Sequence, residues 1–252
     1  MTRIARWLAA ALLAVAPMAA PAVTCTEDRF EGHGFTVCTV DATTQALATF
    51  LYDDTGARYG DFDRLSDALE AEGRALIFAM NGGMYHRDGA PVGHYVEKGQ
   101  TLRRVITAPS GQNFGMLPNG ILCIRDNRAD VIETLAFAAR SPDCRFATQS
   151  GPMLVIDGAL HPRFFSDSPY VKQRNGVGTT PDGRTAYFVV SARRVNFDTF
   201  ARFFRDVLNV NQALYLDGSD AGVSRLFAPQ IGRNDRGRAM GPIIGVTTPR
   251  AP

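Results

Sequence analysis

The sequence is poor in lysine and lacks the short motifs that define many enzyme classes. Its only lysines are Lys98 and Lys172, and neither follows a glycine, so the chain has no Walker phosphate-binding loop. The zinc-protease motif HExxH and the serine-hydrolase motif GxSxG are also missing. The stretch GVGTTPDG has two glycines of a dinucleotide-binding fingerprint but not the third. These absences exclude the usual nucleotide-dependent enzymes and motif-defined hydrolases.

The chain also lacks an excess of charge of either sign. It carries 27 basic and 25 acidic residues, and two of the basic ones, Arg3 and Arg6, lie at the N-terminus. The remainder is close to neutral, so no field that would attract nucleic acid or a membrane surface is expected. No cofactor-binding motif is present, and we expect neither a cofactor nor a nucleic-acid partner.

Residues 1–22 have the composition of a secretory signal peptide. Two arginines precede the apolar stretch WLAAALLAVA, and Ala-Pro-Ala at positions 20–22 resembles a cleavage site. The apolar stretch is too short and too rich in alanine to span a bilayer comfortably. We therefore expect a periplasmic or secreted protein that is not inserted in the membrane after cleavage, with residues 23–252 forming one domain.

The four cysteines predict two disulfides. Cys25, Cys38, Cys123 and Cys144 form no CxxC pair and have no zinc-site spacing. An even number of cysteines in an oxidising compartment indicates disulfides, for which three pairings are possible. We favour Cys25–Cys38 and Cys123–Cys144 because each closes a modest loop, and each would contribute about 2–4 kcal/mol.

Short apolar runs outnumber amphipathic ones. Amphipathic spacing predicts helices over 62–73 and 197–208. Short apolar runs bounded by turn residues predict strands over 35–41, 45–54, 74–80, 120–124, 152–158, 185–191 and 212–218. These elements do not alternate regularly, so the pattern predicts a single α+β domain built on a mostly antiparallel sheet with a few covering helices.

Four polar, glycine-containing clusters stand at the ends of apolar strands. They read MNGGMYHRDGAPVGHYVEKG, TQSGPML, QRNGVGTTPDG and YLDGSDAG. Any one of them alone could be a tight turn. Because active sites favour loops at strand ends, the four together predict a shared cleft.

In this order the clusters resemble the phosphodiester glycosidase family. That family includes the lysosomal uncovering enzyme, which removes N-acetylglucosamine from a sugar phosphodiester. The resemblance runs from about residue 78 to 229. It implies an exported hydrolase that cleaves a glycosyl phosphodiester of envelope or polysaccharide material, with a small molecule or glycan as substrate. One departure is that Ser219-Asp220-Ala221 replaces the glycines that often follow the family's Asp-Gly.

The chemistry of such a bond requires a carboxylate. Cleavage at the anomeric carbon passes through an oxocarbenium-like transition state, and a phosphate leaves with little need of protonation. Asp217, at the end of the apolar run ALYL, is the first candidate, and its alternative role is an Asp-Gly turn. Glu97 in HYVEKG is the second, and its alternative is an exposed strand residue.

Other residues of the clusters are predicted to bind substrate. Arg174, beside Asn175, is the candidate phosphate clamp. Asn81 would bind a sugar hydroxyl, while Gly82 and Gly83 would let the ligand approach the backbone. On this hypothesis, Gly82→Val abolishes turnover and leaves stability nearly intact. The remaining candidates of this kind are Gln149, Ser150, Gly151, Gly218 and Ser219.

Two other functional classes remain open at this point. The chain could be a non-catalytic module that binds a glycan or a sugar phosphate. It could also be a serine or metal hydrolase, with Ser150 as nucleophile or with His86, Asp88 and His94 around a metal. We predict no metal in the favoured function.

Overall fold

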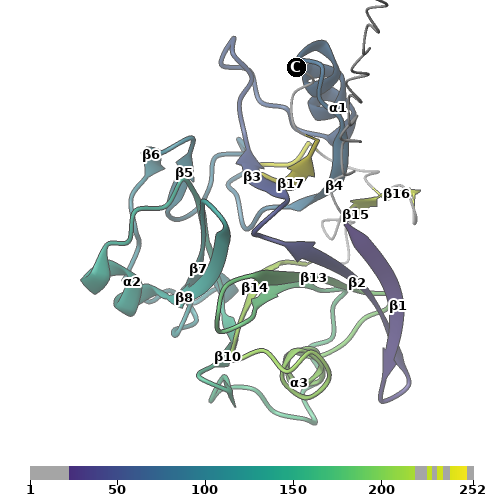
Figure 1. Cartoon of the computed structure of the whole chain (residues 1–252). Coiled ribbons are helices and arrows are strands. Elements are labelled where there is room, and N and C mark those ends of the chain that lie inside the picture. Colours follow the sequence, from purple (N-terminus) through teal and green to yellow (C-terminus); the bar gives the residue numbers. More distant parts are fainter. Residues whose placement is uncertain (1–22, 219–225, 229–231, 235–238, 249–252) are drawn as a thin grey trace, which may run out of the picture.

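The computed structural model describes residues 23–218, 226–228, 232–234 and 239–248. The predicted signal peptide and Ser219 lie outside these residues. Three antiparallel sheets share one core, with the helices on their outer faces (Figure 1). The predicted α+β class, with mostly antiparallel strands, is therefore confirmed.

The largest sheet has seven strands in the order β1-β2-β13-β12-β14-β10-β11. Every neighbouring pair in it is antiparallel. Its strands are β1 (Thr24–Phe30), β2 (His33–Asp41), β10 (Met153–Ile156), β11 (Ala159–Leu160), β12 (Asn175–Thr179), β13 (Thr185–Ser191) and β14 (Gln212–Asp217).

Two five-stranded sheets complete the core. The second sheet has the order β16-β15-β4-β17-β3, and the third has the order β6-β5-β9-β7-β8. The second contains β3 (Ala46–Phe50), β4 (Leu76–Asn81), β15 (Leu226–Ala228), β16 (Gly232–Asn234) and β17 (Ile243–Thr247). The third contains β5 (Tyr95–Glu97), β6 (Gln100–Arg103), β7 (Gly120–Arg125), β8 (Arg128–Glu133) and β9 (Phe146–Ser150).

The helices cover the outer faces of these sheets. They are α1 (Phe62–Ala71), α2 (Thr134–Arg140) and α3 (Phe197–Arg202), which continues as the π-helical turn η2 (Phe203–Val207). A 3-10 turn, η1 (Asn113–Gly115), lies between β6 and β7. Asp61 precedes helix α1, and its side chain caps the first turn by accepting a hydrogen bond from the Arg64 N–H at 2.8 Å.

The central core draws buried side chains from all three sheets. Phe78 of β4 packs against Phe188 of β13 with ring centroids 5.0 Å apart, and Leu122 of β7 joins the same cluster. On the outer face of the seven-stranded sheet, Phe203 of η2 stacks on Phe35 at 4.1 Å. The amphipathic helix predicted over 197–208 thus buries Phe200, Phe203 and Phe204 on this sheet, although its last turn is π-helical.

The favoured disulfide pairing is confirmed. Cys25–Cys38 joins directly opposed residues of the β1–β2 hairpin. Cys123–Cys144 joins β7 to the segment that follows α2. Within the described ranges, no helix is both long enough and apolar enough to cross a membrane.

The second disulfide is predicted to matter more for stability than the first. Cys123–Cys144 spans 21 residues, whereas Cys25–Cys38 spans 13 and joins strands that are already paired. We expect Cys123→Ala/Cys144→Ala to lower the free energy of unfolding by about 3 kcal/mol. Urea unfolding would measure this, with Cys25→Ala/Cys38→Ala as the matched control. An unchanged midpoint for the first variant would contradict the prediction.

Candidate functional site

Three strand ends meet at a chain of hydrogen bonds. Asn81 ends β4, Asn175 begins β12 and Asp217 ends β14. The Asp217 N–H donates to Asn175 Oδ1 at 2.8 Å, and Asn175 Nδ2 donates to Asn81 Oδ1. Both asparagines are fully buried, while Asp217 is partly exposed. Of these three predicted residues, Asp217 therefore presents the reachable ionisable group.

Asp217 is held in an environment that favours its neutral form. Burial raises the pKa of Asp217 to about 6, and the hydrogen bond from the Gly218 N–H to Asp217 Oδ1, at 2.6 Å, only partly opposes this rise. A carboxyl group with a pKa in this range changes charge close to neutral pH. That property suits an acid, a base or a charge stabiliser in a reaction.

Tyr215 is part of this site, and the sequence reasoning missed it. Its hydroxyl donates to the Gly218 carbonyl at 3.0 Å. Burial raises the pKa of Tyr215, and the nearby Asp217 charge raises it further. Tyr215 and Asp217 are two residues apart on β14, and the register shifts between them, so Leu216 is the extra residue of a β-bulge. The closeness of Tyr215 to Asp217 in the chain is the sequence signal that could have found it.

Arg174 lies beside this group, but its guanidinium is buried. Nε donates to the Val195 carbonyl at 2.8 Å and Nη2 to the Tyr170 carbonyl at 2.9 Å. The guanidinium also covers the Phe197 ring at 3.5 Å. Burial lowers the pKa of Arg174. Nη1 has no hydrogen-bond partner among the described residues, although the positive charge is near enough to lower the pKa of Tyr215.

Gly82 and Gly83 have packing reasons for lacking a side chain. A Cβ on Gly82 would lie 3.1 Å from the Pro242 backbone, and the Gly82 N–H donates to the Pro242 carbonyl at 2.7 Å. Gly83 has a φ of +114°, which favours glycine. Thr148 Oγ1 donates to the Gly82 carbonyl at 2.6 Å. The turn is therefore clamped between β17 and β9, and the space beside Gly82 is filled by protein.

The cluster at the end of β9 is divided between two faces of its sheet. Ser150 Oγ donates to the Leu216 carbonyl at 2.6 Å, next to Asp217. Gln149 points to the other side, where its amide accepts from the His94 N–H at 2.9 Å and donates to the Ile106 carbonyl at 2.7 Å. Strand alternation separates Gln149 from Ser150, so only Ser150 joins the Asp217 group.

Gly151 and Gly218 both lie where a side chain would clash. A Cβ on Gly151 would come within 2.6 Å of Asn119, and one on Gly218 within 2.3 Å of the Gln173 carbonyl. Gly218 thus lies directly against the chain that leads to Arg174. Ser219 lies outside the described residues.

Glu97 is not joined to this group by any hydrogen bond or ion pair in the described part of the chain. It accepts a hydrogen bond from the Tyr95 hydroxyl at 2.9 Å, and burial raises the pKa of Glu97. Since Tyr95 pairs with Thr148 and the next residue pairs with Ala147, Glu97 lies level with Phe146, at the opposite end of β9 from Ser150. Four strand steps amount to about 13 Å.

The residues considered for a metal do not gather. His94 Nδ1 lies 2.8 Å from the Arg103 carbonyl, and His86 and Asp88 are exposed. Within the described ranges, no group of three or more His, Cys, Asp or Glu side chains is placed to hold a metal ion.

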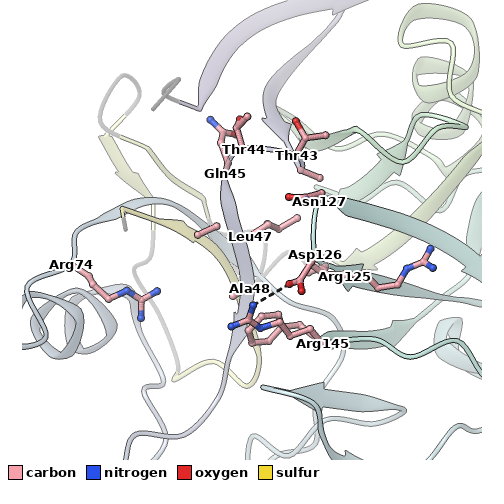
Figure 2. Close-up of a pocket in the computed structure, with 14 residues that line it drawn as sticks. Thr43, Thr44, Gln45, Leu47, Ala48, Arg74, Arg125, Asp126, Asn127 and Arg145 are labelled. Carbon is pink, nitrogen blue, oxygen red and sulfur yellow. Dashed lines mark hydrogen bonds and ion pairs between the residues drawn. The ribbon is translucent and has the colours of Figure 1, made fainter. Parts of the chain in front are cut away.

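A separate cavity of about 570 Å³ lies between β3 and the β7–β8 turn (Figure 2). It contains none of the predicted site residues. Its arginines are engaged: Arg145 pairs with Asp126 at 3.0 Å, and Arg74 donates to Thr247 Oγ1 at 2.6 Å. We therefore keep the Asp217 group as the candidate site.

Comparisons with known proteins give a family model, a curated relative and solved structures of similar fold. The family model described as phosphodiester glycosidase matches residues 74–247. The uncharacterized protein YigE of Escherichia coli strain K12 is 34% identical over 181 residues, covering 72% of this chain and 70% of that protein. The catalytic domain of zebrafish N-acetylglucosamine-1-phosphodiester alpha-N-acetylglucosaminidase has a TM-score of 0.60 at 14% identity, over 89% of this chain and 81% of its own. A hypothetical protein from Synechocystis has a TM-score of 0.56 at 14% identity, and the match covers 89% of this chain and 61% of that protein.

Gly82→Val is now expected to destabilise the protein. Its side chain would press on the Pro242 backbone, which cannot rotate away as a flexible side chain could. Overpacking of this kind costs about 1–3 kcal/mol. Thermal or urea unfolding would measure the loss, with Gly111→Val as control because nothing lies within 4 Å of a Cβ at that position. If the two variants are equally stable, the earlier hypothesis is favoured, in which Gly82 lacks a side chain so that a ligand can approach the backbone.

Asp217→Asn is expected to stabilise the protein at pH 7.5 but not at pH 3.5. The pKa of Asp217 rises from 3.8 to about 6 on folding, so the folded state holds the proton more tightly. Its contribution to stability is full below pH 3.8 and is lost as the pH rises through 6. Asparagine does not ionise, so the variant avoids this loss of unfolding free energy, which is at most about 3 kcal/mol. Urea unfolding of both proteins at the two pH values tests this, and an equal difference at both would refute it.

Proposed function

The chain belongs to the phosphodiester glycosidase family, and from that premise we propose that it is an exported hydrolase that cleaves a glycosyl phosphodiester. The bond broken joins the anomeric carbon of a sugar to a phosphate oxygen. The observation that carries the proposal is the partly exposed Asp217 carboxyl, with its raised pKa, at the meeting point of three strand ends. The two disulfides support an oxidising compartment and hence export.

In the proposed reaction, water replaces the phosphate at the anomeric carbon. The C–O bond to phosphate breaks, and the phosphate monoester leaves with the bonding electron pair. The ionised Asp217 stabilises the positive charge that develops on the sugar and accepts a proton from the attacking water. The products are the free sugar and a phosphate monoester. No proton has to be delivered to the leaving group, because a phosphate is already a stable anion.

The other polar groups would position Asp217 and set the charge around it. The Asn81 and Asn175 amides fix the Asp217 backbone, so the carboxyl group is positioned before substrate arrives. The buried positive charge of Arg174 lies beside Tyr215 at this end of the sheet and favours an anion nearby. This group of residues matches a substrate that joins a sugar to a negatively charged phosphate.

Asp217→Asn is expected to lower kcat on a sugar 1-phosphodiester by at least about 100-fold, because the neutral amide cannot accept the proton. Glu97→Gln is the matched control, and we expect its effect to stay within a few fold because Glu97, on β5, lies level with the end of β9 that is opposite Ser150. For the wild-type protein, kcat/KM should rise as the pH increases through about 6, as Asp217 ionises. The assay follows release of free sugar from a panel that includes N-acetylglucosamine 1-phosphodiesters.

Other outcomes of the same assay identify the alternatives. Full activity of the Asp217→Asn protein would remove Asp217 from the mechanism. Equal losses in the two variants would mean that Glu97 reaches the same substrate, against the strand register. Saturable binding without release of sugar would indicate a non-catalytic binding module.

A further inference from the structure

A cavity of about 400 Å³ lies beside the loop that joins β11 to β12. The loop contributes most of the lining, and the η1 region and the first residue of α3 contribute the rest. Phe164 and Phe197, which both line the cavity, are half-buried and stack with ring centroids 4.9 Å apart and an interplanar angle of 3°. One wall of the cavity therefore contains a well-packed pair of flat rings.

The cavity is closed off from the Asp217 group. It has no lining residue in common with that group. Phe197 contacts the Arg174 guanidinium and the Tyr215 ring, and both of these side chains are buried, so they separate the cavity from Asp217. A ligand group bound in this cavity is therefore not the group on which Asp217 would act.

Two further aromatic rings at the cavity are presented to solvent. Phe165 is 64% exposed and Tyr170 is 79% exposed, more than any other large hydrophobic side chain in the described part of the chain. Both line the cavity. The face of an aromatic ring carries partial negative charge, which attracts the weakly positive hydrogens of C–H bonds. These rings therefore suit a ligand that has a flat face of C–H bonds.

Polar side chains stand among the rings. Asn113, Arg163 and Asp167 line the same cavity and are exposed, and their side chains make no hydrogen bond or ion pair with the other described residues. Arg163 can donate hydrogen bonds, Asp167 can accept them, and Asn113 can do both. Because the charges of Arg163 and Asp167 offset each other, the lining favours a neutral ligand over an anion.

A sugar ring in a glycan has a surface that matches this lining. Its faces present C–H bonds, and its rim carries hydroxyl groups that both donate and accept hydrogen bonds. A purely apolar ligand would leave the three polar side chains unused, and an anion would be repelled by Asp167. A cavity of about 400 Å³ is large enough for about one or two sugar units.

We propose that this cavity is a second, non-catalytic binding site, which holds a neutral sugar unit of a longer glycan by stacking it on Phe165 and Tyr170. Asn113, Arg163 and Asp167 bind the hydroxyl groups of that unit. The site goes beyond the function proposed above and does not depend on it, since the cavity is separate from the Asp217 group. On a polymeric substrate, a glycan held here would raise the local concentration of other parts of the same polymer around Asp217.

The test measures binding of neutral hexasaccharides that carry no phosphate, built from glucose, mannose or N-acetylglucosamine, by saturation-transfer NMR titration. At least one should bind saturably with a Kd of about 1 mM or below. Its affinity should fall at least about ten-fold in Phe165→Ala/Tyr170→Ala. Phe165→Leu/Tyr170→Leu should lose as much, because leucine keeps apolar area but has no flat face. Phe165→Tyr/Tyr170→Phe keeps both rings and should bind within about three-fold of wild type.

Two controls accompany these variants. Leu135→Ala removes another exposed apolar side chain, on α2, and should leave the affinity unchanged. Asp217→Asn should also bind the hexasaccharide as wild type does, because the cavity is separate from that residue. Phe165 and Tyr170 are largely exposed, so their variants should fold, which melting temperatures would verify.

Three results would overturn the inference. They are no binding of any of the three sugars, wild-type affinity in the alanine or the leucine double variant, and a loss in Asp217→Asn equal to that in the alanine double variant. The last result would place the sugar at Asp217 instead. Release of sugar from a 1-phosphodiester is measured in its own assay, so the proposed function stands or fails separately.

Discussion

The hydrogen-bond chain from Asn81 through Asn175 to Asp217 is the contact on which the candidate site depends. It joins the end of β4 in one sheet to the ends of β12 and β14 in another. Both amides are buried, so each would carry a large desolvation cost if it lost its partner. The two sheets therefore hold one relative position at this edge, and the position of Asp217 follows from it.

The third sheet fixes the same edge from another side. Thr148 and Ser150 of β9 donate to the carbonyls of Gly82 and Leu216, one residue away from Asn81 and Asp217 respectively. Each hydroxyl therefore gives a hydrogen-bond donor to a backbone carbonyl at the end of another strand, β4 for Thr148 and β14 for Ser150. The group is thus assembled by contacts between residues that are far apart in sequence. Local sequence can indicate each strand end but cannot indicate how the ends meet.

The sequence was most informative where apolar residues repeat regularly, and least informative where the prediction depended on the direction in which a side chain points. The apolar stripe of 197–208 and the run ending at Asp217 predicted their elements well, because a buried face has to repeat with the period of its element. Strand β1, TCTEDRF, was missed because its side chains are mostly exposed and polar, and α2 because it is only 7 residues long. Gln149 and Glu97 belong to polar clusters that were predicted to share one cleft. In the fold, the Gln149 amide bonds to the His94 N–H and the Ile106 carbonyl, and Glu97 bonds to the Tyr95 hydroxyl, contacts that a single sequence does not indicate.

The bare backbone at Gly82 and Gly83 links the packing of the sheets to the chemistry proposed for the site. Gly82 fits against Pro242 because it has no Cβ, and this lets β4 end close to the start of β17. Asn81, the preceding residue, can then reach Asn175. A structural glycine and a functional amide are therefore two parts of one arrangement. A side chain at Gly82 would act on Asp217 by moving the strand end that positions it, without any contact between the new side chain and a ligand.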